Sequence, residues 1–264
     1  MDARPSGPSA VAEPARIIDR IDTGPRFTAA DVARLNTRFN GVGAREMIRT
    51  VLAEKLLGRV AVISSFGTES AVLLHLMAEA DPSIPVLFLD TGKMFPETLA
   101  YRDALIEKLG LTGVRTLMPE VDTIEKRDGT GLRWSYDPDG CCEIRKVIPL
   151  GKAMADFDAS ISGRKGFQAS TRANILPFEL DGDRIKFNPL ATWSKIDLDV
   201  YFDTYDLPRH PLEAQGYLSI GCAPCTSIVT AGEDPRAGRW RGWDKVECGI
   251  HGEPLIRPGE EPAF

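Results

Sequence analysis

Five cysteines have a spacing that could do chemistry. Cys141 and Cys142 are adjacent, and Cys222 and Cys225 form a Cys-x-x-Cys pair further along the chain. Four thiolates in two close pairs suit either a tetrahedral zinc ion or a [4Fe–4S] cluster. Because adjacent cysteines diverge on a helix, they fit two corners of a cluster better than one zinc ion. The spacing therefore favours iron–sulfur, with a redox Cys-x-x-Cys or a coincidental buried pair as the alternatives.

The fifth cysteine, Cys248, lies in the segment Glu-Cys-Gly-Ile-His and could be a nucleophile. Four cations precede it: Arg236, Arg239, Arg241 and Lys245. Neighbouring cations lower the pKa of a thiol, and the thiolate is the reactive form. The glycine that follows would let this thiol enter a pocket and then move out to a second protein. The alternative is an inert thiol near a frayed terminus.

A Gly- and Ser-rich turn between an apolar run and a helical segment could bind an anion. Its residues are Ser64, Ser65, Phe66, Gly67, Thr68, Glu69 and Ser70. Such a turn at the start of a helix presents free N–H groups and hydroxyls. It is not a Walker A loop, because the Gly-Lys-Ser/Thr ending is missing. An ordinary turn with Thr68 or Ser65 as the helix N-cap is the alternative.

Several basic residues follow the first cysteine pair and the last predicted parallel strand. They are Lys146, Arg164, Lys165 and Arg172. They could converge on one sheet edge as phosphate or sulfate ligands, although each alone could be a solvated surface charge. Of the histidines, we expect His75 and His210 to be structural and His251, three residues after Cys248, to be functional. The four tryptophans are interpreted as packing groups.

The elements that must position these residues alternate along the chain. Apolar, β-branched runs predict buried strands at 59–66 and 85–90, and the segments at 114–119 and 159–163 are interpreted as a third and a fourth strand. Helical periodicity covers 29–57, 69–80, 96–110, 141–157 and 195–205. This alternation predicts an α/β fold with a mostly parallel, twisted sheet flanked by helices. Since ligands bind at the carboxyl ends of parallel strands, the turn at 64–70 and the strand end at Leu89 should line one site.

The ends of the chain differ in composition from its middle. Residues 1–16 contain three prolines without periodicity and are expected to form a disordered leader. Residues 17–231 would form the α/β domain. Residues 232–264 are rich in glycine and proline and would form a mobile tail that carries Cys248.

Composition excludes some classes of protein. With 32 Lys and Arg against 38 Asp and Glu, the net charge is −6, which argues against non-specific nucleic-acid binding. The length of 264 residues suits one large domain. We expect no bilayer-spanning segment and no secretory signal, which makes the cytoplasm the default location.

Five segments together resemble the assimilatory adenylyl-sulfate/phosphoadenylyl-sulfate reductase family: SSFGTESAVLLHL, LFLDTGKMFPETLAYRD, CCEIRKV, GCAPCT and ECGIH. The resemblance implies the adenine-nucleotide α-hydrolase-like (PP-loop) fold. Members with both cysteine pairs bind a [4Fe–4S] cluster and typically act on adenosine 5′-phosphosulfate (APS), whereas members without the pairs use the 3′-phosphorylated form (PAPS). The resemblance therefore implies an APS reductase that uses thioredoxin or a glutaredoxin-like dithiol, with PAPS as the alternative substrate.

The same resemblance implies roles for individual residues. Cys248 would attack the sulfate sulfur, expel AMP and carry an S-sulfocysteine, from which the dithiol releases sulfite. The cluster would be held by Cys141, Cys142, Cys222 and Cys225, with Lys146 linking cluster and substrate electrostatically. The turn Ser64–Ser70 would lie near the phosphosulfate, and the backbone at Leu89 near the adenine. The residues that would neutralise the anion are Arg164, Arg172, Arg236, Arg239 and His251.

Two other functions compete with this one. A PP-loop ATP pyrophosphatase needs an aspartate near the magnesium pyrophosphate, and the presence of Thr68 and Glu69 in that region counts against it. A non-catalytic iron–sulfur protein that senses a nucleotide would explain four cysteines but would leave Cys248 without a role. Family members are often homo-oligomers, although the sequence has no isolated interface signature.

Overall fold

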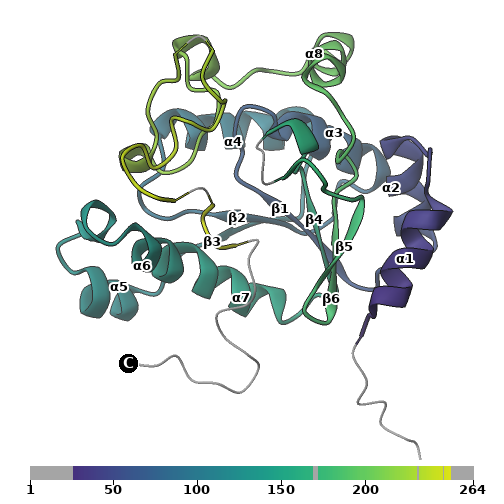
Figure 1. Cartoon of the computed structure of the whole chain (residues 1–264), viewed down its shortest axis with the longest axis horizontal. Coiled ribbons are helices and arrows are strands. Elements are labelled where there is room, and N and C mark those ends of the chain that lie inside the picture. The colour runs from purple at the N-terminus through teal and green to yellow at the C-terminus, as the bar shows by residue number, and fades with distance from the viewer. Residues whose placement is uncertain (1–25, 169–171, 231, 246, 251–264) are drawn as a thin grey trace, which may run out of the picture.

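The computed structural model describes residues 26–168, 172–230, 232–245 and 247–250. A six-stranded sheet lies between two layers of helices (Figure 1). Its strands are β1 (Val60–Ser64), β2 (Val86–Leu89), β3 (Val114–Leu117), β4 (Ala159–Ser162), β5 (Phe178–Asp181) and β6 (Arg184–Phe187). The strand order is β3-β2-β1-β4-β6-β5, in which β5 pairs antiparallel with β6 and the other neighbours pair in parallel.

The main helices are α1 (Ala29–Arg38), α2 (Ala44–Ala53), α3 (Ser70–Ala80), α4 (Pro96–Leu109), α5 (Val121–Asp128), α6 (Pro138–Cys142), α7 (Ile148–Met154) and α8 (Lys195–Thr204). A π-helical turn, Glu143–Val147, joins α6 to α7. Short 3-10 turns lie at Arg133–Ser135, Gly166–Gln168, Glu213–Gln215 and Ala223–Cys225. None of the helices in the described ranges is long and apolar enough to cross a lipid bilayer.

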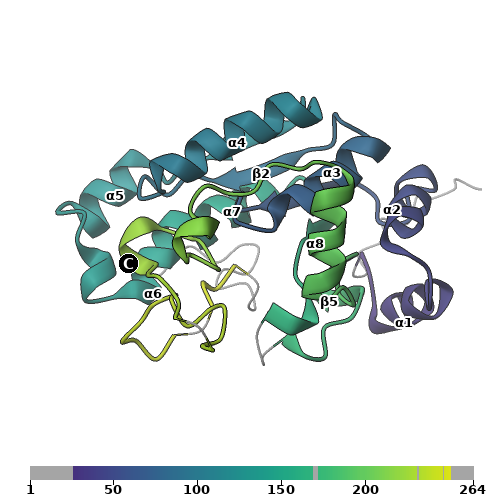
Figure 2. The same ribbon diagram turned by 90° about the horizontal axis from the view of Figure 1, so that it is seen from above.

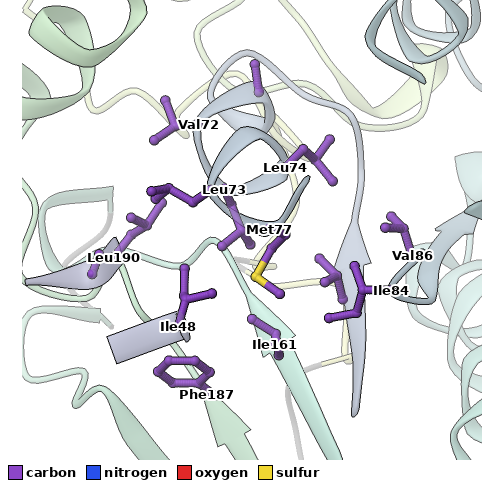
Figure 3. Close-up of a cluster of buried hydrophobic side chains, with 14 of the residues drawn as sticks. Ile48, Val72, Leu73, Leu74, Met77, Ile84, Val86, Ile161, Phe187 and Leu190 are labelled. Carbon is purple, nitrogen blue, oxygen red and sulfur yellow. The ribbon is translucent and has the colours of Figure 1, made fainter. Parts of the chain in front are cut away.

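Both faces of the sheet are covered, as a parallel sheet requires. One face packs against α2, α3, α4 and α8. Figure 3 shows Ile48 of α2 and Met77 of α3 directed at Ile161 of β4 and Phe187 of β6. The opposite face packs against α7 through a smaller cluster that includes Leu87 and Leu150. Strands β2 and β4 are buried along their whole length; β2 is continuously apolar, whereas β4 alternates Ala and Ile with two buried serines, Ser160 and Ser162.

The strand order reverses beside β1. The chain passes from β1 to β2 and β3 on one side, and then returns to place β4 on the other side of β1. In open α/β sheets, such a reversal leaves a crevice at the carboxyl ends of the two central strands. The fold class predicted from the sequence is confirmed, and the position of this crevice determines where a site can form.

The chain after α8 folds over the carboxyl end of the sheet, beside α6. Figure 2 shows this yellow segment next to α6, where Lys245 forms an ion pair with Asp139. An isolated β-bridge between Met94 and Cys222 joins the loop after β2 to this segment. The first 16 residues and residues 251–264 of the expected tail lie outside the described ranges, and the mobility expected for both termini remains a prediction.

The helices predicted from the sequence differ from the observed ones in three details. The single helix expected over 29–57 is two helices, because the chain turns at Gly41, whose φ of +75° suits glycine. The helix expected from Cys141 starts earlier, at Pro138, where the Asp137 side chain accepts a hydrogen bond from Gly140 N–H. It then widens into the π-turn just before Pro149, which cannot donate a hydrogen bond to the preceding turn.

Candidate active site

A cavity of about 490 Å³ occupies the crevice at the carboxyl ends of β1 and β4. Ile63 and Ser64 line it from β1, and Ser162 lines it from β4. The segment after α8 closes the opposite side. This is the position at which ligands bind in doubly wound α/β sheets.

The cavity gathers most of the residues selected from the sequence. Its lining includes Ser64, Ser65, Gly67, Thr68, Glu69, Ser70, Leu89, Lys146, Arg164, Arg172, Cys222, Arg236, Arg239 and Cys248. The described residues that line it do not include Cys141, Cys142 or Cys225. His251 lies outside the described ranges. The functional roles of these residues remain predictions, but residues up to 184 positions apart meet at one cavity because the fold brings them there.

The turn after β1 is held in an unusual backbone conformation. Phe66 has a φ of +49°, which costs a non-glycine residue about 1–3 kcal/mol. Two contacts stabilise it: the Phe66 ring packs edge-on against Phe88 at 5.3 Å between centroids, and Phe66 N–H donates to Ser64 Oγ at 3.2 Å. The fully buried Phe66 ring therefore anchors the turn, while Ser65 and Gly67 face the cavity.

The start of α3 lies at the cavity, which Glu69 and Ser70 line. Its N-cap residue, Glu69, makes no capping hydrogen bond with its side chain. The alternative that Thr68 or Ser65 caps this helix is wrong, because Glu69 is the N-cap and the Thr68 hydroxyl donates to Leu218 C=O at 3.1 Å. Uncapped N–H groups at a helix start form a favourable site for an anion.

Glu69 joins the two sides of the crevice through a buried ion pair. Lys165 Nζ lies 2.8 Å from Glu69 Oε2, and Gln168 Nε2 donates to the same oxygen at 2.8 Å. Lys195 lies further away, with Nζ 3.9 Å from Glu69 Oε1. Glu69 thus neutralises part of the positive charge at the N-terminus of α3 and holds the loop that follows β4 in place.

The cavity carries an excess of positive charge. Seven Lys and Arg side chains line it against three Glu side chains. Arg164 donates to Glu179 at 3.0 Å, and Arg239 Nη1 donates to Ile220 C=O at 3.3 Å. Arg172 and Arg236 both donate to Glu247. A cavity with this charge favours a small anion with several oxygen atoms.

Three buried donors at the cavity have no hydrogen-bond partner within the described part of the chain. They are Arg164 Nε, Arg239 Nε and Trp240 Nε1. Buried N–H groups are almost always paired, and the residues that carry these three donors line the cavity, so the donors are candidates to bind the oxygen atoms of an anion.

The Trp240 ring also makes cation–π contacts with three neighbouring cations. Trp240 is 2% exposed, and its backbone has a φ of +49°. The guanidinium carbon of Arg239 lies 4.4 Å from the centre of the indole, and that of Arg236 lies 6.0 Å away. Lys245 Nζ lies 5.4 Å from the same ring. The packing role expected for the tryptophans therefore holds for Trp240, and its unpaired N–H adds a second role that the sequence did not indicate.

The four thiols expected to bind a metal come from two segments that lie near each other. Cys141 and Cys142 end α6, and Cys222 and Cys225 flank a 3-10 turn. Burial raises the pKa of Cys141 to about 11, with Cys142 and Cys222 adding to the effect. Burial likewise raises the pKa of Cys225, with Cys222 and Cys142 as the next causes. Thiols that influence each other's pKa in this way belong to one neighbourhood.

Cys222 differs from the other thiols. Burial alone would raise its pKa, but the charge of Lys146 and a hydrogen bond with Thr91 Oγ1, 3.2 Å from Sγ, lower the pKa below its ordinary value. Within the described ranges, no group of three or more His, Cys, Asp or Glu side chains converges closely enough to hold a metal ion. The donor set nevertheless fits an iron–sulfur cluster in number and chemistry, since its four thiols are free.

Cys248 is half-buried and lines the cavity together with Lys146. Burial alone would lower the pKa of the Lys146 ammonium, but three neighbouring thiols raise it above its ordinary value. In decreasing order of effect, these are Cys222, Cys142 and Cys248. Lys146 therefore lies near two of the predicted cluster ligands and near the predicted nucleophile.

Some lining residues were not selected from the sequence. They are Ser162, Lys195, Gln168, Trp240 and Glu247. Ser162 could have been found from its place at the end of β4. The role of Glu247 depends on its contact with Arg172, 75 positions away, which no local pattern indicates.

The chain is similar to known proteins over most of its length. The family model of the phosphoadenosine phosphosulfate reductase domain matches residues 59–228. The chain is 47% identical to an adenosine 5′-phosphosulfate reductase of Mesorhizobium japonicum, over 89% of this chain and 93% of the relative. It is 40% identical to a phosphoadenosine 5′-phosphosulfate reductase of Gloeobacter violaceus, over 73% of this chain and 82% of the relative.

A solved structure shares the fold. The phosphoadenylyl-sulfate reductase of Candida auris, crystallised with phosphate, aligns with a TM-score of 0.65 at 21% identity and covers 77% of this chain and 98% of its own. The family match over residues 59–228 spans the sheet and the cavity-lining loops up to Cys222, whereas the lining residues from Pro235 to Ile250 lie beyond it. This chain belongs to the phosphoadenosine phosphosulfate reductase family.

Proposed function

We propose that this chain is an APS reductase of sulfate assimilation, which converts adenosine 5′-phosphosulfate to sulfite and AMP. The relative from Mesorhizobium japonicum, an adenosine 5′-phosphosulfate reductase, supports this proposal at 47% identity. A second relative with the same name, from Chelativorans, is 46% identical over 86% of this chain.

One structural observation carries the proposal: a cysteine lies on the wall of a basic cavity that has unpaired buried donors. Cys248, Arg164 and Arg239 all line this cavity. Attack of a thiolate on a sulfate brings like charges together, so the cavity must offset their repulsion. Preorganised cations and N–H donors in a partly buried site provide that stabilisation.

Each group at the cavity has a role in this reaction. The turn Ser64–Ser70 and the uncapped amides of α3 would bind oxygen atoms of the phosphosulfate. The backbone at Leu89, at the end of β2, would contact the adenine. The cations that would neutralise the anion are Lys146, Arg164, Arg172, Arg236 and Arg239. His251, outside the described ranges, is proposed as a further ligand of the anion.

The first step transfers the sulfonate group to the enzyme. Cys248 Sγ donates an electron pair to the sulfate sulfur and forms an S–S bond. The bond between that sulfur and the bridging oxygen breaks, and AMP leaves with the bonding pair. Cations around the cavity stabilise the negative charge that develops on the leaving phosphate.

The second step releases sulfite. A thiolate of thioredoxin or a similar dithiol protein attacks Cys248 Sγ, the S–S bond breaks, and sulfite leaves with the electron pair. The second thiol of the partner resolves the mixed disulfide and returns Cys248 to its thiol form. The two electrons come from the dithiol, which ends as a disulfide. Such a donor and five free cysteines suit the reducing cytoplasm.

A [4Fe–4S] cluster is part of the proposal. Cys141, Cys142, Cys222 and Cys225 would hold it, since their thiols influence one another's pKa and supply four sulfur donors. When bound, the cluster would change the electrostatic field at the cavity. Lys146, which interacts with Cys222 and Cys142, would orient the substrate anion relative to that field.

PAPS is the second candidate substrate, and the relative from Gloeobacter violaceus supports it. The decisive experiment measures sulfite release from APS and from PAPS side by side, with thioredoxin as the reductant. We expect faster release from APS. A preference for PAPS would overturn the choice of substrate, and no sulfite from either would overturn the proposed function. Consumption of ATP and Mg²⁺ would instead indicate a PP-loop ligase.

A further inference from the structure

Glu247, which directly precedes Cys248, occupies two arginines of the cavity. Glu247 Oε1 accepts from Arg172 Nε at 2.9 Å and from Arg172 Nη2 at 2.7 Å. Glu247 Oε2 accepts from Arg236 Nη2 at 3.1 Å. The carboxylate thus bridges two guanidinium groups from segments that are far apart in the sequence.

These contacts are protected from water. The side chain of Arg172 is 8% exposed, that of Arg236 is 16% exposed and that of Glu247 is 29% exposed. Gln168 Oε1 accepts from Arg172 Nη1 at 2.8 Å and fixes the guanidinium in its plane. Arg236 is held over the Trp240 ring. Each guanidinium group therefore has a contact besides Glu247: Gln168 for Arg172 and the Trp240 ring for Arg236.

Two guanidinium groups that face one bidentate oxyanion can bind a phosphate or sulfate equally well. Both arginines line the cavity, and so does Glu247. We propose that Glu247 is an internal competitor for the substrate anion: in the free enzyme its carboxylate occupies Arg172 and Arg236, and the phosphosulfate displaces it on binding.

This inference rests on the proposed function and adds a positioning residue to it. In the free enzyme, the two ion pairs hold the backbone of Glu247, and therefore Cys248, at the cavity wall. When the anion takes the two arginines, the segment that carries Cys248 is released from them. Gly249, with a φ of +84°, follows directly and lets the backbone turn. The displacement of the Glu247 carboxylate by the anion therefore affects the affinity for the substrate and also releases the backbone next to Cys248 from the two arginines.

The test measures binding without turnover. Cluster-loaded Cys248→Ser protein is titrated with APS by calorimetry, alone and combined with Glu247→Gln, Glu247→Asp or Glu233→Gln. Glu233→Gln is the matched control, because Glu233 makes two hydrogen bonds to Arg241 in the same segment but does not line the cavity. Adenosine serves as the uncharged ligand.

Competition predicts that Glu247→Gln tightens APS binding about tenfold, since charge-assisted pairs no longer have to break. Glu247→Asp keeps the charge but is too short to bridge both arginines, so it should also tighten binding, about threefold by the same argument. The affinity of the Glu247 variants for adenosine should stay unchanged, and so should the affinity of Glu233→Gln for APS.

Equal or weaker APS binding by Glu247→Gln would overturn the proposal. An unchanged affinity in Glu247→Asp would also overturn it, because a long-range charge effect alone would then explain Glu247→Gln. An equal gain for adenosine would point to a loosened cavity and would contradict it as well. Failure of the proposed function is detected separately, as absence of sulfite from the enzyme that retains Cys248.

Discussion

Lys165 and Glu69 form an ion pair across the crevice, with Lys165 Nζ 2.8 Å from Glu69 Oε2 and the Lys165 side chain 2% exposed. Lys165 follows β4, and Glu69 precedes α3. The pair therefore links the two strands between which the strand order reverses. It fixes the loop after β4 relative to the turn expected to bind the phosphosulfate.

Removing Lys165 should destabilise the fold. Lys165→Met leaves a largely buried carboxylate without its ammonium partner, which should lower the free energy of unfolding by about 3 kcal/mol. Urea denaturation measures this. Lys152→Met is the control: Lys152 pairs with Glu120 at the surface, with the two side chains 58% and 60% exposed, so its loss should cost less than about 1 kcal/mol. An equal loss in the free energy of unfolding in both variants would show that the buried Lys165–Glu69 pair stabilises the fold no more than a surface ion pair does.

Trp240→Phe should weaken substrate binding more than folding. The variant keeps a ring beneath Arg239 but removes the Nε1–H group, which has no partner in the described structure. If that group binds a substrate oxygen, KM for APS should rise by about tenfold, the value of one lost hydrogen bond. Trp243→Phe, at an exposed position, should leave KM unchanged. An unchanged KM in Trp240→Phe would restrict Trp240 to packing.

His210 should make stability depend on pH. Burial lowers the pKa of His210 from 6.5 to about 4, and its Nδ1 accepts from Leu212 N–H at 3.2 Å. Between these pH values the unfolded chain binds more protons than the folded one. The free energy of unfolding should therefore fall as the pH drops from 6.5 to about 4, by about 3 kcal/mol in total.

The comparison is with His210→Gln, measured by urea denaturation at several pH values. This variant lacks the titrating group, so its stability should fall less steeply over the same range. Parallel pH profiles for the two proteins would show that His210 does not titrate as its burial requires.

Loss of one predicted ligand should remove the cluster. Cys222→Ser should lower the iron and acid-labile sulfide per chain and bleach the visible absorbance, because thiolates are the ligands that iron–sulfur clusters require. Cys248→Ser should keep both, since Cys248 is assigned to catalysis. Wild-type protein that holds zinc, or no metal, after anaerobic purification would refute the assignment.

The sequence predicted the central part of the fold because local patterns determine it. The runs that became β1 and β2 are almost entirely apolar, and each is followed by a turn or helix of recognisable composition; the β4 run is short and alternates apolar residues with serine. Strand β5 was missed, because Phe-Glu-Leu-Asp is short and half acidic, and its pairing with β6 depends on a tight turn at Gly182, with φ +64°. Helix α5 was missed because its sequence is mostly charged.

The site was predictable in kind but not in its contacts. A cysteine in a basic segment and a Ser-rich turn after a strand indicate their chemistry directly, and the sheet brings both to one edge. The pairing of Glu247 with Arg172, or of Glu69 with Lys165, depends on tertiary packing between residues 75 and 96 positions apart. No periodicity or motif specifies such pairs.

The central claim is that Cys248 forms a covalent bond to the sulfur of the substrate. Wild-type protein is mixed with sulfur-radiolabelled APS in the absence of a dithiol, digested, and mapped by mass spectrometry. We predict the label on the peptide that contains Cys248, as an S-sulfo group, and its release as sulfite when thioredoxin is added. Label on another cysteine, or sulfite produced by Cys248→Ser with thioredoxin, would contradict the account.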